Sequence, residues 1–564
     1  MLEHIADLPE KLRVGQTKAI LALADFFHDH DRGILWMCCG SGKTVACAVD
    51  IELRGEPLTV VFTPYIHLVK QWQRDYQKWL PTTQAKFMCV CSEKDPAYEL
   101  DPIEKADLLK SAENASAEEF SQLVDEAKKS HGQLQVSTDA EEIASFLKQK
   151  GRKVVFCTYA SSPVYGEAQR LAGIHANYGV FDEAQWTATG ENDTQATYPL
   201  HDVNVQIDKR LFTTATVRHY TRKGMIYSMD NESVYGRHVL IDGNGNPDPW
   251  TTRQAIEHKE VSPYRIVISF ITDPTFDPRI VQLPRFQDLK SNRGEEEWAE
   301  VLRRIGQATA MERLKEKYGV KKPLGFFDTV STARLYTDIL NVCKKYPEHF
   351  PELSRSEPAV SISTYESRAE RKRRVAHLHN SPETEVNNSR LFLFGTDEST
   401  IDSVFFGDPM TSNINVIQAS GRALRYVPGK IATIMLPAML PYYGNDLQGY
   451  AKTITSKHVH DAYRYIIDIL DGLADMDPLL RDQVLSGSGT KNDGSKIIEF
   501  DFPEEILPEI RKAITTEVWR EVDPESDFVE ALLQSAAALE RYRFQKFPPQ
   551  DNNEKERRMS TRVI

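Results

Sequence analysis

Short apolar runs and longer amphipathic stretches alternate along most of the 564-residue chain. Apolar runs that are rich in β-branched and aromatic residues, with helical stretches between them, predict parallel strands buried on both faces. A first series of runs lies at 33–37, 57–64, 153–160, 178–184 and 210–216. A second series lies at 264–271, 323–329, 359–364, 390–397, 403–409 and 430–437. The pattern therefore predicts an α/β protein with two parallel-sheet domains in tandem.

Changes in composition along the chain suggest where these domains begin and end. We expect the first domain over 1–258, with a polar helical insertion at about 92–150 and a turn-rich hinge region at about 220–258. The second domain is expected over 259–440. Strand signals become scarce after that point, so the pattern predicts a helical C-terminal region over 441–564 that ends in a disordered tail.

The overall composition excludes several classes of protein. With 41% hydrophobic and 27% charged residues, the chain has the composition of an ordinary soluble globular protein. The 69 Lys and Arg against 82 Asp and Glu give a net charge of −13, which excludes a generally basic surface but not a local basic groove. No apolar run approaches the ~18 residues of a membrane span, so we expect no membrane partner. Seven cysteines without a CxxC pair argue against a disulfide framework and favour a cytoplasmic location.

The strongest local signal is the segment CCGSGKT at 38–44, which lies between a predicted strand and a predicted helix. Glycines in such a loop let backbone N–H groups surround phosphate oxygens, the lysine reaches the β- and γ-phosphates, and the final hydroxyl can ligate Mg²⁺. The strict phosphate-loop pattern has glycine where this chain has Met37. The alternative interpretation of the segment is an ordinary glycine turn at the start of a helix. The residues that we expect to bind ATP phosphates are Gly40, Ser41, Gly42, Lys43 and Thr44, with Thr44 also on Mg²⁺.

Two adjacent carboxylates, Asp182 and Glu183, follow the apolar residues 178–181. ATP hydrolysis needs one acid to hold Mg²⁺, usually through water, and another to polarise the attacking water. We expect Asp182 in the first role and Glu183 in the second. Alone, such a pair is also typical of a solvated turn or of a helix N-terminus, where carboxylates are stabilised. Because it follows a phosphate loop along the chain, it indicates a Walker B motif.

Two arginines, Arg422 and Arg425, lie at i, i+3 in the predicted second domain. Guanidinium groups can stabilise the charge that spreads over a transferring γ-phosphoryl group. Since they belong to the second domain, these residues would reach the nucleotide only when the two domains close, and closure would convert nucleotide state into motion. Without the other motifs, a surface salt-bridge helix would be the default interpretation.

In their order and spacing, the motifs from about residue 12 to 437 resemble those of superfamily 2 helicases and translocases of the DEAD/DEAH-like type. The segments at 221–239 and 254–268 further resemble bacterial and phage helicases related to type I restriction motor subunits. The motif segments are LRVGQ (12–16), MCCGSGKT (37–44), FTPYIHLVKQW (62–72), VSTDAEEIASFL (136–147), FCTYASS (156–162), FDEAQ (181–185), TTATVR (213–218) and QASGRALR (418–425). The resemblance implies two RecA-like domains with ATP between them and a nucleic-acid strand across their tops.

The resemblance also assigns roles to single residues. It implies that Gln16 contacts adenine and that Gln418 binds the nucleotide. The residues that it implies along the nucleic-acid path, or in coupling that path to hydrolysis, are Thr63, Thr158, Thr214, Thr216, Gly395 and Asp397. A strand end with capped backbone groups would explain Thr214 about as readily as a coupling role.

The chain departs from the family pattern at two places. Gly395 and Asp397 follow their predicted strand almost directly, where relatives have several more residues, so the contact made by Asp397 stays open. Gln185 stands where His or Asp is usual. Because that position usually serves coupling rather than hydrolysis, we expect ATP hydrolysis to survive the change.

The predicted function is a nucleic-acid-dependent ATPase that translocates on DNA and unwinds or remodels duplexes. DNA is favoured over RNA because members of the subgroup often act on DNA. One alternative is an RNA helicase. Another is a nucleotide-gated motor or sensor subunit of a larger defence or replication complex, without unwinding of its own. Residues 441–564 would support strand separation or dock a protein partner.

Overall fold

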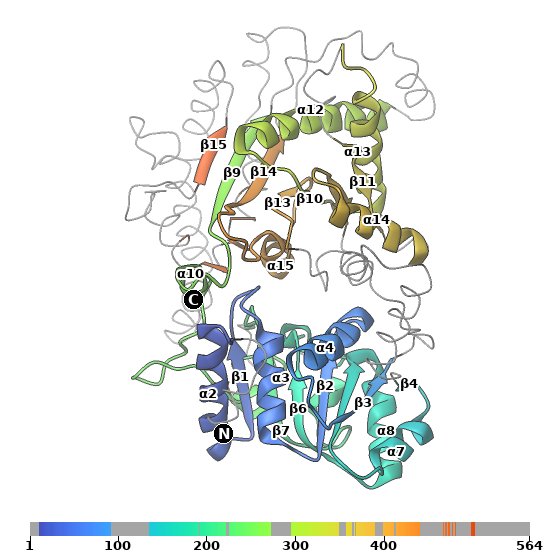
Figure 1. The fold of residues 1–564 in the computed structure, drawn as a ribbon, viewed down its shortest axis with the longest axis vertical. Coiled ribbons are helices and arrows are strands. Elements are labelled where there is room, and N and C mark those ends of the chain that lie inside the picture. Colours follow the sequence, from blue (N-terminus) through green and yellow to red (C-terminus); the bar gives the residue numbers. More distant parts are fainter. Residues whose placement is uncertain are drawn as a thin grey trace, which may run out of the picture. The chain divides into compact units, whose positions relative to one another are not determined.

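The computed structural model (Figure 1) divides into two compact units, and the boundary along the chain lies between Glu260 and Val261. The residues that it describes are 11–91, 135–190, 192–220, 225–271, 295–348, 357–363, 366, 368–389, 399–410, 413–439, scattered positions within 466–480, and 498–501. Among the described residues, no helix combines the length and the apolar character needed to cross a membrane.

The first unit is built on an eight-stranded, all-parallel sheet with the order β4-β3-β5-β2-β6-β7-β1-β8. Its strands are β1 (Arg32–Trp36), β2 (Leu58–Thr63), β3 (Lys86–Val90), β4 (Gln135–Ser137), β5 (Lys153–Thr158), β6 (Ala176–Phe181), β7 (Ile207–Thr214) and β8 (Arg237–His238). The central strands β2 and β5 are buried along their whole length, which explains their continuous apolar runs.

Helices cover both faces of this sheet (Figure 1). The helices are α2 (Val14–Asp29), α3 (Lys43–Arg54), α4 (Ile66–Trp79), α7 (Ala140–Leu147), α8 (Ser162–Ala172), α9 (Glu232–Tyr235) and α10 (Thr252–Glu257). Alternate residues of β2, Leu58, Val60 and Phe62, share one core with α7 and α8, while α4 packs on β2 and β5. Because successive side chains of a strand point to opposite faces of the sheet, β2 contributes side chains to the packing on both faces.

The second unit contains a seven-stranded parallel sheet with the order β11-β12-β10-β13-β14-β9-β15. Its strands are β9 (Tyr264–Ile271), β10 (Pro323–Phe326), β11 (Val360–Ser361), β12 (Val386–Asn388), β13 (Ser403–Phe406), β14 (Ala432–Met439) and β15 (Ile498–Asp501). Its helices are α12 (Glu295–Tyr318), α13 (Val330–Cys343), α14 (Arg368–Asn380) and α15 (Asn413–Ala423). The predicted α/β class with two parallel sheets is therefore confirmed.

The structure adds detail to three parts of the predicted organisation. The range 92–150 contains the edge strand β4 as well as α7, and its residues 92–134 lie outside the described ones. The range 220–258 folds into the first unit, where β8 pairs with β1 and Trp250 pairs with Met37. In the C-terminal range 441–564, β15 pairs with β9, so this range supplies a strand to the second sheet. The predicted strand at 390–397 lies outside the described residues.

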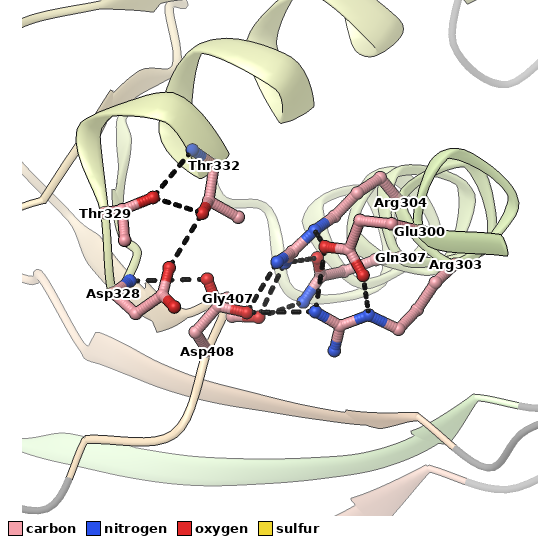
Figure 2. Close-up of polar contacts among 9 residues, drawn as sticks. All are labelled: Glu300, Arg303, Arg304, Gln307, Asp328, Thr329, Thr332, Gly407 and Asp408. Atoms are coloured by element: carbon pink, nitrogen blue, oxygen red, sulfur yellow. Dashed lines mark hydrogen bonds and ion pairs between the residues drawn. The ribbon is translucent and has the colours of Figure 1, made fainter. Parts of the chain in front are cut away.

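A buried polar cluster holds together the carboxyl ends of β10 and β13 in the second unit (Figure 2). Arg304 of α12 is 1% exposed and donates to Asp408 Oδ1 at 2.6 Å and to the carbonyl oxygen of Gly407 at 2.9 Å. Asp408 Oδ2 accepts the backbone N–H of Asp328 at 3.3 Å. Asp328 Oδ1 in turn accepts the hydroxyl of Thr332, in the first turn of α13, at 2.8 Å. One arginine on α12 thus fixes the two loops that lead into α13 and towards α15.

Candidate functional site

The phosphate loop lies at the carboxyl end of β1, next to the ends of β7 and β6. Gly40 and Gly42 have φ of 81° and 85°, in the left-handed region that other residues rarely adopt, so the loop requires glycine at both positions. The Ser41 hydroxyl donates to the carbonyl oxygen of Cys38 at 2.7 Å. Lys43 Nζ lies across the loop and donates to the carbonyl oxygens of Met37 and Cys38, each at 3.2 Å. Helix α3 begins at Lys43, as the loop pattern predicts.

The start of helix α2 covers this loop. Gln16 Nε2 donates to the carbonyl oxygen of Gly42 at 3.3 Å, and Gln16 Oε1 accepts the backbone N–H of Arg13 at 2.9 Å. A Cβ added at Gly42 would lie 2.2 Å from Gln16 Nε2, so glycine is needed for the close approach as well as for φ. The Arg13 guanidinium donates to the carbonyl oxygen of Gly40 at 2.9 Å. The structure therefore joins Gln16 to the loop, although the two are 26 residues apart.

Asp182 and Glu183 follow β6, two strands from β1 in the sheet. Asp182 is buried, its Oδ2 accepts the indole N–H of Trp72 at 2.7 Å, and its Oδ1 accepts the backbone N–H of Glu183 at 3.0 Å. Thr213 Oγ1 lies 3.4 Å from the same Oδ1. Helix α4 and strand β7 thus hold this carboxylate in a fixed orientation at the strand end.

Glu183 is joined to β7 through Gln185. Gln185 is 1% exposed, its Nε2 donates to Glu183 Oε2 at 2.6 Å, and its Oε1 accepts the Thr214 hydroxyl at 2.7 Å. Thr214 Oγ1 also accepts the backbone N–H of Thr216 at 2.9 Å. Glu183 itself has φ of 51°, a strained conformation for a residue with a side chain. Thr214 thus caps the backbone at the strand end and also contacts Gln185 through its hydroxyl, while its coupling role stays a prediction.

The charged groups of the loop and of the strand end shift one another's pKa values. Burial, and next the charge of Glu183, raise the pKa of Asp182 to about 6, although the Trp72 hydrogen bond and Lys43 act in the other direction. Burial lowers the pKa of Lys43, but the negative potential of Cys39, Glu183 and Asp182 outweighs it and leaves the pKa above its usual value. Lys43 therefore stays cationic beside two acidic side chains, which is the charge pattern expected of a phosphate and metal site.

The remaining predicted residues fall into three groups. Thr44 follows Lys43 in α3, whereas the buried Thr63 and Thr158 hydroxyls donate within their own turns, to the Tyr65 carbonyl at 3.1 Å and to Ser161 Oγ at 2.9 Å. In the second unit, Gln418 and Arg422 lie on α15, and Arg425 follows that helix and pairs with Val261. Gly395 and Asp397 lie outside the described residues.

Sequence reasoning missed three residues that shape this site. Trp72 occupies an apolar position of an amphipathic helix, and only its contact with Asp182 shows its part in the site. Arg13 lies within the motif segment 12–16 but has no role of its own there, and Glu260 lies in the charged run 257–260 without a motif to mark it. The side chain of each contacts a backbone group, of Gly40 or of Gly15. Every residue has such groups, so the sequence does not reveal these contacts.

A family model described as the "Type III restriction enzyme, res subunit" matches residues 10–191. The chain is 26% identical over 361 residues to the "Probable helicase A859L" of African swine fever virus (strain Badajoz 1971 Vero-adapted), a match over 64% of this chain and 35% of that protein. The chain therefore spans about a third of the length of this relative.

Two solved structures share the fold. One is the ATP-dependent Type ISP restriction-modification enzyme LlaBIII bound to DNA, with a TM-score of 0.64, 19% identity, and coverage of 90% of this chain and 32% of that one. The other is a nuclease-deletion mutant of the Type ISP enzyme LlaGI in complex with a DNA substrate mimic, with a TM-score of 0.52, 19% identity, and coverage of 92% and 32%. Residues 10–191 are therefore similar to the res subunit of Type III restriction enzymes, and the chain shares its fold of two parallel sheets in tandem with Type ISP restriction-modification enzymes.

Proposed function

We propose that this protein hydrolyses ATP and uses the energy to translocate on DNA or to unwind it. The observation that carries the proposal is the arrangement at the strand ends of the first unit. A phosphate loop with its lysine, a paired carboxylate motif and a side-chain link to β7 lie at the ends of β1, β6 and β7. Steady-state ATP hydrolysis by the full chain, with and without single-stranded DNA, tests this proposal.

The residues present fit ATP and Mg²⁺. The loop combines two left-handed glycines with a cationic lysine, which suits the oxygens of a triphosphate. The Thr44 hydroxyl and the Asp182 carboxylate are oxygen ligands of the kind that Mg²⁺ prefers, directly or through water. When bound, the metal ion would offset the charge that develops on the phosphates. Gln16 and Gln418 would complete the nucleotide site, as the resemblance implies.

The protein groups then have separate roles. Lys43 orients the terminal phosphates, and Glu183 accepts a hydrogen bond from the attacking water and takes up its proton. Arg422 and Arg425 of the second unit would stabilise the charge on the transferring phosphoryl group. The DNA preference is supported by the two solved structures of similar fold, which are complexes with DNA and with a DNA substrate mimic.

Replacing Gln185 by alanine is expected to separate hydrolysis from its stimulation by DNA. Glu183, Asp182 and Lys43 remain in the variant, so ATP turnover without DNA should stay within about threefold of the wild type. Stimulation should fall close to onefold, because the Gln185 amide is the link between Glu183 and Thr214. Turnover is measured at saturating ATP, with and without single-stranded DNA.

Gln169→Ala is the matched control for this prediction. Gln169 is also buried and also makes two amide hydrogen bonds, both to the backbone of Gln206. It lies on α8, away from the strand ends, so its loss should lower stability and leave the stimulation ratio unchanged. A normal stimulation ratio in Gln185→Ala would contradict the role given to this link.

A further inference from the structure

Glu183 has a backbone conformation that a residue with a side chain rarely adopts. Its φ and ψ are 51° and 50°, which lie in the left-handed region. Among the residues that the structure describes, Lys259 is the only other non-glycine residue with positive φ. Such a conformation is strained and persists only where the surrounding groups hold it. The groups that hold the Glu183 backbone therefore also decide where its carboxylate lies.

The peptide that joins Asp182 to Glu183 is held at both of its polar groups. Its N–H, which belongs to Glu183, donates to Asp182 Oδ1 at 3.0 Å. Its carbonyl oxygen, which belongs to Asp182, accepts the hydroxyl of Tyr159 at 2.9 Å. A peptide unit is planar, so these two hydrogen bonds fix the plane from which φ of Glu183 is measured. Tyr159 thus contributes directly to holding Glu183 in the left-handed region.

The groups that follow in the chain hold Glu183 in other ways. The N–H of Trp186 donates to the carbonyl oxygen of Glu183 at 3.0 Å, where the 3-10 helix η2 (Ala184–Trp186) is formed. The Gln185 amide donates to the Glu183 carboxylate at 2.6 Å. The main chain before Glu183 therefore depends on Tyr159, whereas the side chain depends on Gln185.

Tyr159 reaches this peptide from another strand of the same sheet. It follows β5 and begins the 3-10 helix η1 (Tyr159–Ser161), and β2 lies between β5 and β6 in the sheet. Its ring lies nearly parallel to that of Phe62 on β2, at 13° and with centroids 6.1 Å apart, and its other ring neighbour is Phe181. The side chain is 3% exposed. Packing therefore fixes the ring, and replacement by phenylalanine removes only the hydroxyl.

The Tyr159 hydroxyl is in the form that can donate a hydrogen bond. Burial, and next the charge of Asp182, raise the pKa of Tyr159 well above its usual value. A phenol with a raised pKa stays protonated at neutral pH, and only the protonated form donates to a carbonyl oxygen. The hydrogen bond to the Asp182 carbonyl oxygen is therefore present at every pH near neutrality.

We propose that Tyr159 is a positioning residue for Glu183 and holds it in its strained conformation through the carbonyl oxygen of Asp182. The inference rests on the proposed function, because that function gives Glu183 its role towards the attacking water. All the groups involved belong to the first unit. Without the hydroxyl, the peptide before Glu183 keeps one of its two hydrogen bonds and can rotate towards a negative φ. That rotation moves the Glu183 carboxylate relative to an unchanged phosphate loop.

Tyr159→Phe tests this proposal most simply. The kcat for ATP should fall about tenfold, because the carboxylate leaves its productive position for most of the time. The Kd for a non-hydrolysable ATP analogue should stay within about twofold, since Lys43 and the phosphate loop are intact. A fall in kcat without a change in Kd separates misplacement of the base from damage to the nucleotide site.

Tyr178→Phe is the matched control. Tyr178 is a fully buried tyrosine of β6, and its hydroxyl donates to Asp50 Oδ2 at 2.8 Å. This substitution also removes a buried hydrogen bond, so hydrogen exchange in the first unit should accelerate at least as much as in Tyr159→Phe. The peptide before Glu183 keeps both of its partners, so kcat should equal that of the wild type. Equal losses of kcat in the two variants would reduce Tyr159 to a stabilising role and overturn the inference.

Combination with Glu183→Gln tests whether Tyr159 acts through Glu183. Glu183→Gln removes the base, and its slow hydrolysis is followed under single-turnover conditions with enzyme in excess. If Tyr159 serves only to place the base, the double variant should hydrolyse ATP within about twofold of the rate of Glu183→Gln alone. A further tenfold loss in the double variant would show that Tyr159 acts by another route and would overturn the inference.

The same measurements separate this inference from the proposed function. A wild-type protein without Lys43-dependent hydrolysis would overturn the proposed function itself. A Tyr159→Phe variant with the wild-type kcat, in a protein whose hydrolysis depends on Lys43 and Glu183, would overturn only the role of Tyr159. We expect a reduced kcat with an unchanged Kd in Tyr159→Phe, and no further loss when Glu183 is already replaced.

Discussion

Replacing Lys43 by alanine is expected to lower ATP turnover by at least about a hundredfold while the first unit stays folded. The side chain contributes charge rather than packing, since its Nζ contacts only the carbonyl oxygens of Met37 and Cys38 among the hydrogen bonds of the loop. Although burial opposes it, the negative potential of Cys39, Glu183 and Asp182 keeps the pKa of Lys43 above its usual value, which favours a cation at this place. Turnover is measured at saturating ATP, and far-ultraviolet circular dichroism checks the fold.

Lys86→Ala is the control for the Lys43 variant. Lys86 begins strand β3, next to the edge strand β4 of the same sheet, and its Nζ donates to the exposed side chain of Gln149 at 3.2 Å. Its removal should leave turnover unchanged. If Lys43→Ala hydrolysed ATP at the wild-type rate, the assignment of the phosphate loop would be wrong.

Arg304→Ala is expected to destabilise the second unit by about 3–5 kcal/mol, whereas Arg303→Ala should cost about 0–1 kcal/mol. Both arginines donate to Asp408 Oδ1, Arg304 at 2.6 Å and Arg303 at 3.1 Å. They differ in burial, because the Arg304 side chain is 1% exposed and the Arg303 side chain is 36% exposed. Loss of Arg304 removes the buried cation that pairs with the Asp408 carboxylate and one of the two donors to the Gly407 carbonyl oxygen, whereas water can replace Arg303.

Hydrogen exchange of the full chain provides the measurement for this pair. Peptides that cover the paired strands β10 and β13 report the opening free energy of the second unit, and peptides from the first unit serve as an internal reference. Exchange should accelerate strongly in the second unit of Arg304→Ala and little in that of Arg303→Ala. Equal effects of the two substitutions would show that burial does not determine how much each arginine stabilises the second unit.

The sequence is sufficient to predict the strands in which every residue is buried. Strands β2 and β5 are buried at every residue, so their apolar runs stood out. Strand β12 was missed because two of its three residues are asparagines, Asn387 and Asn388, which are fully buried between β11 and β10. The Asn388 amide donates to the carbonyl oxygen of Gly325 at 3.0 Å, a contact that satisfies a polar side chain where an apolar one would be expected.

The candidate site also contains residues that the sequence reveals and residues that it does not. The loop glycines and Lys43 carry their chemistry in a local motif, so they could be found from spacing alone. Trp72 could not be found in this way, because its indole N–H reaches Asp182 across 110 positions of the sequence. Glu260 is similar, since its partner Gly15 lies 245 positions away and contributes only a backbone N–H. Long-range contacts of this kind depend on how the sheet orders its strands, which a single sequence does not state.

The most direct test of the account is steady-state ATP hydrolysis by the full chain with no nucleic acid, with single-stranded DNA, with duplex DNA and with RNA, using Lys43→Ala as the background. We expect hydrolysis that depends on Lys43 and is stimulated most by one form of DNA. Greater stimulation by RNA would make RNA the substrate. Lys43-dependent turnover that responds to none of the polymers would contradict the translocase and point instead to a nucleotide-gated subunit that needs a protein partner.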